Sequence, residues 1–146
     1  MNPNTIKIRF KRLTPAAVIP KRGSASAAGY DLTAIRITGS EDQPGLIRIG
    51  TGIAVEIPEG YAGFIFPRSS VYKTRSILSN CVGVVDSDYR GEIMAAFFSW
   101  NRDIFYHVGD RFAQMVILPV PAVEFLEAEE LSATERGTGG YGSTGR

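Results

Sequence analysis

The segment LIRIGTGIAVEIPEGYAGFIF (residues 46–66) carries the clearest strand signal in this sequence. Its first half alternates in part between apolar and other residues, and Gly50 and Gly52 interrupt the alternation. Pro58 and the pair Glu59-Gly60 end that half, and the short apolar run YAGFIF follows. Partial alternation and short apolar runs bounded by turn residues predict two β-strands separated by a turn.

The same pattern recurs along the rest of the chain. TIKIRF (residues 5–10) alternates polar and apolar residues, and EIMAAFF (92–98) and FAQMVIL (112–118) are short apolar runs. Further turn signals lie at residues 86–91, 101–103 and 109–110, at the spacing of roughly 8–12 residues that is typical of a β-sandwich or barrel. Residues 123–131 form the only helix-like run, and RSSVYKT (68–74) could form a helical turn. The sequence therefore predicts an all-β fold of short strands.

Size and composition limit the class of protein. A chain of 146 residues is long enough for one domain with a real core, and we expect residues 1–134 to form it. The net charge of +1, from 16 basic and 15 acidic residues, gives no sign of a surface for nucleic acid. With one cysteine and one histidine, neither an internal disulfide nor a Cys/His zinc site is expected. The sequence contains no apolar stretch long enough to span a membrane and no signal peptide, so we expect a soluble, cytoplasmic protein.

The C-terminal segment ERGTGGYGSTGR (residues 135–146) is rich in glycine. It matches the dinucleotide-binding pattern by spelling only, since no strand precedes it in the right way and no chain remains for the following helix. One interpretation is a disordered terminus. The other is a flexible flap, in which glycine N–H groups approach phosphate oxygens, Arg136 and Arg146 neutralise charge, and Tyr141 stacks on a flat ring. A nucleoside triphosphate offers both kinds of contact.

Two internal segments also carry candidate chemistry. In GVVDSDYRGEI (residues 83–93), the acidic residues either only favour a hairpin turn or place Asp86 at a strand end, where a carboxylate can deprotonate a water molecule. In FPRSSVYK (66–73), Arg68, Ser69 and Ser70 either begin a surface helical turn or bind a phosphate. Taken alone, AAGYDL (27–32) and GDRFAQMVI (109–117) predict only turns that lead into strands.

In chain order, AGYDL, PRSS, GVVDSDYRGEI, GDRFAQ and RGTGGYGSTG resemble the five motifs of the homotrimeric deoxyuridine triphosphatase (dUTPase) family, over residues 28–145. The resemblance implies a jelly-roll-like β-barrel and a trimer whose three active sites each use motifs from more than one subunit. It implies the reaction of dUTP with water to give dUMP and pyrophosphate, with Mg²⁺ on the phosphates. This reaction would limit uracil incorporation into DNA and supply dUMP for thymidylate synthesis.

The resemblance also implies a role for each matching residue. Asp86 would be the base that activates water, Gln114 would lie near the α-phosphate, and Asp31 would hold Mg²⁺ through water. The nucleoside would contact Asn80, Gly83, Val84, Val85, Tyr89 and Met94, with Tyr89 against the deoxyribose. The phosphates would contact Arg68, Ser69 and Ser70, and in the tail Arg136, Thr138, Gly140, Ser143 and Thr144, while Tyr141 would cover the uracil. Two positions depart from the commoner pattern: Ser70 stands where many members have Gly, and Tyr141 where Phe is commoner.

Two alternatives differ in chemistry. The dCTP deaminases resemble this family and share the Arg-Ser-Ser stretch, but they need a glutamate ten residues beyond the aspartate, where this chain has Ala96. The other alternative is a jelly-roll protein that has kept the fold without the activity. The presence of Asp86, Gln114 and Arg136 together favours an enzyme.

Overall fold

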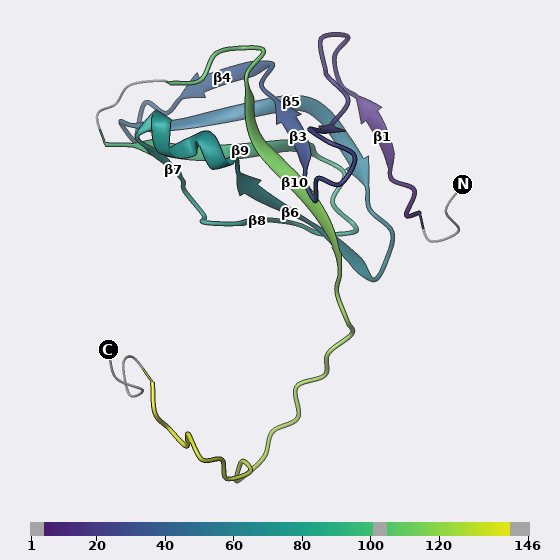
Figure 1. Ribbon diagram of the computed structural model, residues 1–146, viewed down its shortest axis with the longest axis vertical. Helices are drawn as coiled ribbons and strands as arrows, with labels where there is room; N and C mark the ends of the chain where they lie inside the picture. The colour runs from purple at the N-terminus through teal and green to yellow at the C-terminus, as the bar shows by residue number, and fades with distance from the viewer. Residues whose placement is uncertain (1–4, 101–104, 141–146) are drawn as a thin grey trace.

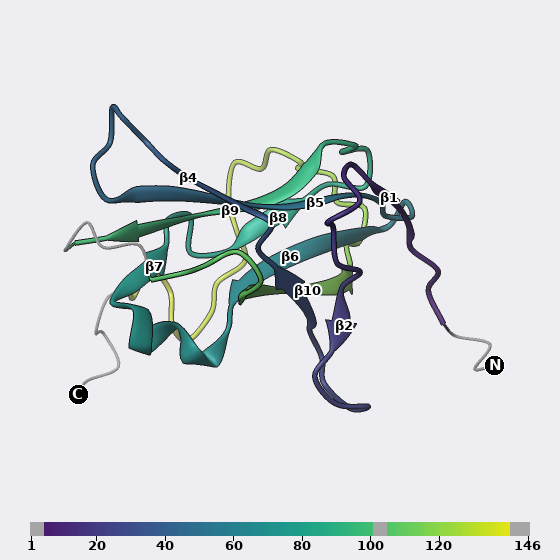
Figure 2. The same ribbon diagram turned by 90° about the horizontal axis from the view of Figure 1, so that it is seen from above.

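The structure, a computed structural model, describes residues 5–100 and 105–140. It contains two five-stranded sheets, packed face to face in Figures 1 and 2, and every strand pairing in them is antiparallel. The first sheet has the order β1 (Arg9–Arg12), β5 (Leu46–Glu56), β9 (Glu92–Ser99) and β7 (Ser76–Leu78), and β4 (Arg36–Gly39) also pairs with β5. The second has the order β2 (Lys21–Arg22), β3 (Tyr30–Thr33), β10 (Arg111–Pro119), β6 (Tyr61–Pro67) and β8 (Gly83–Val85). The predicted all-β fold is confirmed.

The four longest predicted strands correspond to β5, β6, β9 and β10, and RSSVYKT contains the 3-10 helix η1 (Ser69–Thr74). One prediction from the pattern was right only in part, and another was wrong. TIKIRF enters a strand only at Arg9, because Arg9 pairs with Glu56 at the end of β5 and the residues before it have no strand to pair with. Residues 123–131 form no helix. Their apolar side chains have no partner in the barrel, and an isolated helix of this length is unstable in water.

The core lies between the two sheets and centres on aromatic side chains. Phe97, Phe112 and Tyr106 are buried, with ring centroids 5.2 to 6.4 Å apart. β9 alternates strictly, so Ile93 and Phe97 point into this core while Glu92 and Met94 lie on its other, partly exposed face. The alternation fixes which side chains of β9 can contribute to a site outside the core.

The glycines that interrupt the pattern in residues 46–58 mark a bulge in β5. Between its pairings with Met94 and Glu92, β5 advances from Gly50 to Ala54, so four residue steps oppose two on β9. Gly52 has a φ of 64°, in the left-handed region that favours glycine. The buried Thr51 hydroxyl donates to the Ile93 carbonyl at 2.7 Å and therefore satisfies a β9 backbone group inside the bulge.

Beyond β10 the chain leaves the sheets as an extended segment (Figure 1), and residues 120–140 contain no helix or strand. Several apolar side chains in it are almost fully exposed, and Phe125 is 96% exposed. The division into a domain of residues 1–134 and a flap of residues 135–146 stays a prediction. In the described part of the chain, no helix is long and apolar enough to cross a membrane.

Candidate active site

A pocket of about 230 Å³ lies beside β8 and the start of β9. Seven of the residues predicted from the sequence line it, namely Asn80, Gly83, Val84, Val85, Asp86, Tyr89 and Met94. The remaining lining residues are Ile65, Glu92 and Ile93. The structure therefore places the predicted base beside all the predicted nucleoside contacts except Tyr141, which lies outside the described residues.

The local backbone explains why these residues meet. β8 is the last strand of its sheet and pairs only with β6, so its outer edge keeps backbone N–H and C=O groups available to a ligand. Gly83 pairs with Ile65, and a Cβ built at position 83 would lie 3.1 Å from the Ile65 Cβ and 3.6 Å from the Asn80 Nδ2. Glycine at this position therefore lets β8, Ile65 and Asn80 pack closely at the base of the pocket.

Tyr89 forms a wall of the pocket and is held at both ends. Its backbone N–H donates to the Asp86 carbonyl at 3.2 Å, which closes the turn after β8. Its hydroxyl donates to the Glu92 carbonyl at 3.1 Å. The ring lies across Gly91, where a Cβ would come within 2.5 Å of the ring Cζ. Asp86 itself is exposed at the end of β8, where its carboxylate can reach solvent.

A second cluster gathers residues from three other motifs on β3, β6 and β10. β10 runs between β3 and β6, so Gln114 pairs with Asp31 on one side and with Phe66 on the other (Figure 1). The Asp31 carboxylate binds Arg68 Nε at 2.9 Å and Arg111 Nη1 at 3.0 Å. The Gln114 side chain donates to the Pro67 carbonyl at 3.1 Å. Three motifs that are distant in the sequence thus meet at one end of this sheet.

The same cluster sets limits on phosphate and metal binding. Arg68 uses two of the five N–H donors of its guanidinium for Asp31 and the Arg111 carbonyl, so donors remain for a phosphate. Ser69 and Ser70 are exposed beside it, at the start of η1. A Cβ at Gly29 would lie 2.4 Å from Gln114 Oε1, so glycine is required where the chain passes this amide.

Asp31 was the predicted magnesium residue. Its side chain is only 14% exposed, and each carboxylate oxygen already accepts from an arginine. The described residues contain no group of three or more His, Cys, Asp or Glu side chains that could hold a metal ion. This donor set fits an Mg²⁺ ion that is bound mainly by a substrate's phosphates and water, with Asp31 reached through water.

Within one chain the predicted site residues fall into separate groups. Both groups adjoin β6, but no side-chain hydrogen bond or ion pair between described residues joins the pocket beside β8 to the Asp31 cluster. Arg136 donates to the Gly139 carbonyl at 2.9 Å in an exposed turn that also contains Thr138, and Gly140 follows it. Arg136, Thr138 and Gly140 are not among the residues that line the pocket beside β8. Tyr141, Ser143 and Thr144 lie outside the described residues.

Sequence reasoning missed two residues that the structure adds to these groups. Arg111 is the second cation on Asp31, and its position in the GDRFAQ motif was the available signal. Glu92 lines the pocket and binds Arg36, which lies 56 residues away in the sequence. No local pattern links these two residues, so only the folded strand register reveals the pair.

Comparisons with known proteins agree with the motifs. The dUTPase family profile matches residues 16–145. The deoxyuridine 5'-triphosphate nucleotidohydrolase of Desulfitobacterium hafniense is 43% identical, over 99% of each chain. The solved structure of the Staphylococcus bacteriophage 80alpha dUTPase with dUPNHPP has a TM-score of 0.83 and 28% identity, covering 97% of this chain and 100% of that one.

A mutant dUTPase from phage phi11 of S. aureus, described for its coordination of a structural Mg(II) ion, has a TM-score of 0.72 and 25% identity, covering 87% of this chain and 99% of that one. These matches confirm the resemblance found in the motifs and leave no support for a deaminase or for a protein without activity. Across nearly its whole length, this chain belongs to the dUTPase family and is an enzyme that hydrolyses dUTP.

Proposed function

We propose that this dUTPase forms dUMP and pyrophosphate by attack of a water molecule on the α-phosphate, with Asp86 as the base that activates the water. The observation that carries the proposal is the pocket beside β8, where Asp86 lines the same cavity as the predicted nucleoside contacts. A base at the edge of a nucleoside pocket lies close to the first phosphate of a bound nucleotide. Phosphoryl transfer needs alignment and charge neutralisation more than covalent help.

The uracil ring binds against β8. Asn80 and the backbone of Gly83, Val84 and Val85 supply donors and acceptors in fixed positions. Cytosine presents the opposite donor and acceptor at two ring positions, so it would leave buried polar groups unpaired, and such mismatches can discriminate by about 10⁴ or more. Thymine differs only by a methyl group, and a pocket of about 230 Å³ excludes it by contact.

The sugar and its phosphates extend from this pocket. Tyr89 packs against the deoxyribose, where a 2'-hydroxyl would collide with the ring, and Met94 completes the pocket. Arg68, Ser69 and Ser70 bind phosphate oxygens, and the Gln114 amide lies near the α-phosphate and the attacking water. The tail closes over the triphosphate through Arg136, Thr138, Gly140, Ser143 and Thr144, and Tyr141 covers the uracil.

Asp31 contacts Mg²⁺ through water when the metal accompanies the triphosphate. The metal supplies charge neutralisation on the phosphates, which lowers the cost of building negative charge there. Arg68 and Arg111 hold the Asp31 carboxylate in place through two ion pairs. The dependence of activity on Mg²⁺ is part of this proposal.

A homotrimer is the assembly that best accounts for the separation of the site residues. No side-chain hydrogen bond or ion pair among the described residues joins the Asp86 pocket to the Asp31 cluster, yet the reaction needs both at one α-phosphate. We therefore propose that each active site is completed by residues from neighbouring subunits. The enzyme would work in the cytoplasm without binding nucleic acid directly, and it would limit uracil in DNA and supply dUMP for thymidylate synthesis.

The test is a substrate panel of dUTP, dCTP, dTTP and UTP, scored for pyrophosphate and ammonia with and without Mg²⁺. We expect pyrophosphate from dUTP only, no ammonia, and loss of activity with a chelator. Asp86→Asn should bind a non-hydrolysable dUTP analogue normally and lose turnover by a factor of about 10² or more. A near-normal rate in Asp86→Asn would exclude Asp86 as the base, whatever the substrate panel shows.

A further inference from the structure

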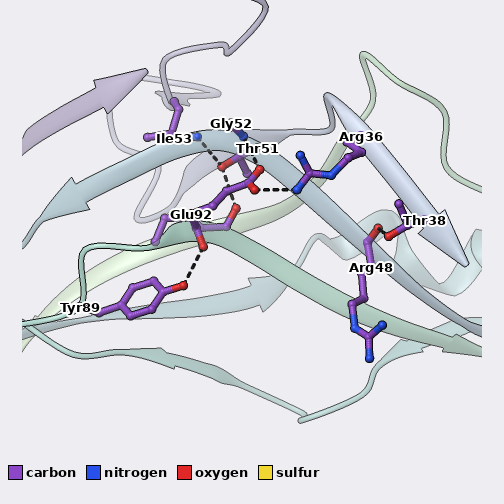
Figure 3. Close-up of polar contacts among 9 residues, drawn as sticks. Arg36, Thr38, Arg48, Thr51, Gly52, Ile53, Tyr89 and Glu92 are labelled. Atoms are coloured by element: carbon purple, nitrogen blue, oxygen red, sulfur yellow. Dashed lines mark hydrogen bonds and ion pairs between the residues drawn. The ribbon is translucent and has the colours of Figure 1, made fainter. Parts of the chain in front are cut away.

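The Glu92 carboxylate makes polar contacts with Arg36 and with the backbone at Gly52 (Figure 3). One oxygen binds Arg36 Nη2 at 2.6 Å, and the other accepts from the Gly52 backbone N–H at 2.8 Å. The Glu92 side chain is only 16% exposed, whereas that of Arg36 is 50% exposed. Both carboxylate oxygens are therefore engaged, by two different strands, β4 and β5.

The bulge in β5 is shaped to receive this carboxylate. A Cβ built at Gly50 would lie 2.5 Å from Glu92 Oε1 and 2.9 Å from Arg36 Nη2, so any side chain there would displace the ion pair. Gly52 has a left-handed φ of 64° and donates its backbone N–H to the Glu92 carboxylate. Gly50 thus leaves the space that the ion pair fills, while at Gly52 a Cβ would meet Ile35 and Thr14 and only the backbone N–H faces Glu92.

The backbone of Glu92 connects the same contact to the pocket. Its carbonyl accepts the Tyr89 hydroxyl at 3.1 Å, and only Arg90 and Gly91 separate the two residues (Figure 3). Glu92 and Tyr89 both line the pocket. The hydroxyl end of the Tyr89 ring is therefore attached to a residue whose own side chain is fixed by β4 and β5.

We propose that Glu92 is a positioning residue for sugar selectivity: bound to Arg36 and to the β5 bulge, it holds the Tyr89 ring at the distance that admits deoxyribose and rejects ribose. This inference rests on the proposed role of Tyr89. It assigns a role in sugar selectivity to Arg36, Glu92 and the Gly50–Gly52 bulge, although none of them contacts the reacting atoms in the proposed mechanism. No hydrogen bond or ion pair among the described residues joins the Asp86 side chain to the Arg36–Glu92 pair, so we expect the effect to fall on sugar selectivity more than on the chemical step.

The experiment compares kcat/KM for dUTP and for UTP in Glu92→Gln, Arg36→Gln and the double variant. Glutamine can still accept from Gly52 but presents an amide instead of a charge to Arg36. We expect the ratio of dUTP to UTP to fall at least about 10-fold in Glu92→Gln, within the roughly 100-fold effect of a 1 Å displacement. In Arg36→Gln, whose residue lies outside the lining of the pocket, kcat for dUTP should stay within about 3-fold of the unmutated enzyme. The double variant should fall no further than the larger single change, because both act through one contact.

Glu56→Gln is the matched control, since Glu56 forms an exposed ion pair with Arg9 of β1 and does not line the pocket. It should leave the ratio unchanged. A merely structural role for Glu92 would lower kcat/KM for both nucleotides by the same factor and keep their ratio, and that result overturns the proposal. Should Glu92→Gln fail to fold, Arg36→Gln alone tests it, because Arg36 is half exposed.

The unmutated enzyme and Tyr89→Ala separate this inference from the proposed function. If the unmutated enzyme prefers dUTP and Tyr89→Ala loses that preference while Arg36→Gln and Glu92→Gln keep it, only the role of Glu92 is refuted. If Tyr89→Ala keeps the preference, the proposed role of Tyr89 is refuted, and the role of Glu92 is refuted with it.

Discussion

Replacing Gly91 by alanine should damage the pocket without unfolding the protein. A Cβ at this position would lie 2.3 Å from the Tyr89 hydroxyl oxygen and 2.5 Å from the ring Cζ. Gly91 has no left-handed φ, so alanine adds no backbone strain, and the whole effect comes from this contact. The ring is a side-chain end that can swing outward, so the contact is relieved by moving Tyr89 rather than by moving β9.

The size of the effect follows from these distances. Ordinary contact between heavy atoms needs about 3.5 Å, so the ring must move by about 1 Å, and a displacement of this size can cost up to about 100-fold in rate. We expect kcat/KM for dUTP to fall about 10- to 100-fold. The lost hydrogen bond from Tyr89 to Glu92 costs about 1 kcal/mol, and the lower chain entropy of alanine in the unfolded state offsets about half of this or more.

Steady-state pyrophosphate release and thermal unfolding measure the two quantities on the same samples. Gly39→Ala is the matched control, because a Cβ at Gly39 meets no atom within 4 Å, and we expect both quantities to be unchanged. A Gly91→Ala enzyme with kcat/KM within 2-fold of the unmutated one would refute the reasoning that the Tyr89 ring must stay in place. A large loss of thermal stability would refute the claim that the ring yields first.

Three further substitutions test other parts of the molecule. Asp31→Asn removes the charge between Arg68 and Arg111. We expect the free energy of unfolding, measured with urea, to fall by about 2–4 kcal/mol and the enzyme to need a higher Mg²⁺ concentration for activity. If neither quantity changes, the proposed role of Asp31 is contradicted. Burial raises the pKa of Tyr106. The stability that the neutral Tyr106 side chain contributes is therefore complete below about pH 10, the pKa of an unfolded tyrosine, and is lost as the pH rises through the folded pKa. Tyr106→Phe should lose less stability between pH 9 and pH 11 than the unmutated protein, and an equal shift of the two urea midpoints would contradict this prediction. Tyr141→Phe should be nearly silent and Tyr141→Ala should weaken dUTP binding and turnover, whereas equal turnover by Tyr141→Ala would contradict a closing tail.

Local pattern was sufficient for the strands that are long and bounded by turn residues. β5, β6, β9 and β10 each combine a run of apolar residues with Gly, Pro or Asp at their ends, and each was predicted within a few residues. The local pattern failed where the secondary structure of a segment depended on a neighbouring strand to pair with or on a surface to pack against. Residues 5–8 alternate like a strand but pass the end of β5, and residues 123–131 are apolar but meet nothing in the barrel.

The pocket could be assembled from the motifs because all of its lining residues except Ile65 lie close in sequence, between Asn80 and Met94. Long-range contacts could not. Arg36 and Glu92 meet through the register of two different strands on β5, and Asp31 and Arg111 meet across 80 residues. The spacing of these four charged residues in the sequence does not distinguish them from other charged residues on the surface. Which of them meet depends on the register of the strands, and that register depends on the whole sheet.

The small volume of the pocket beside β8 has a consequence for inhibitor design. The pocket has a volume of about 230 Å³, while Arg68 and the exposed residues Ser69 and Ser70 lie outside its lining, at the start of η1. In the proposed binding mode, groups added to the base would meet the pocket lining, and groups exchanged along the phosphate chain would lie in the more exposed region beside η1. Compounds that keep an unmodified deoxyuridine and vary the anionic part offer the widest chemical freedom against this enzyme.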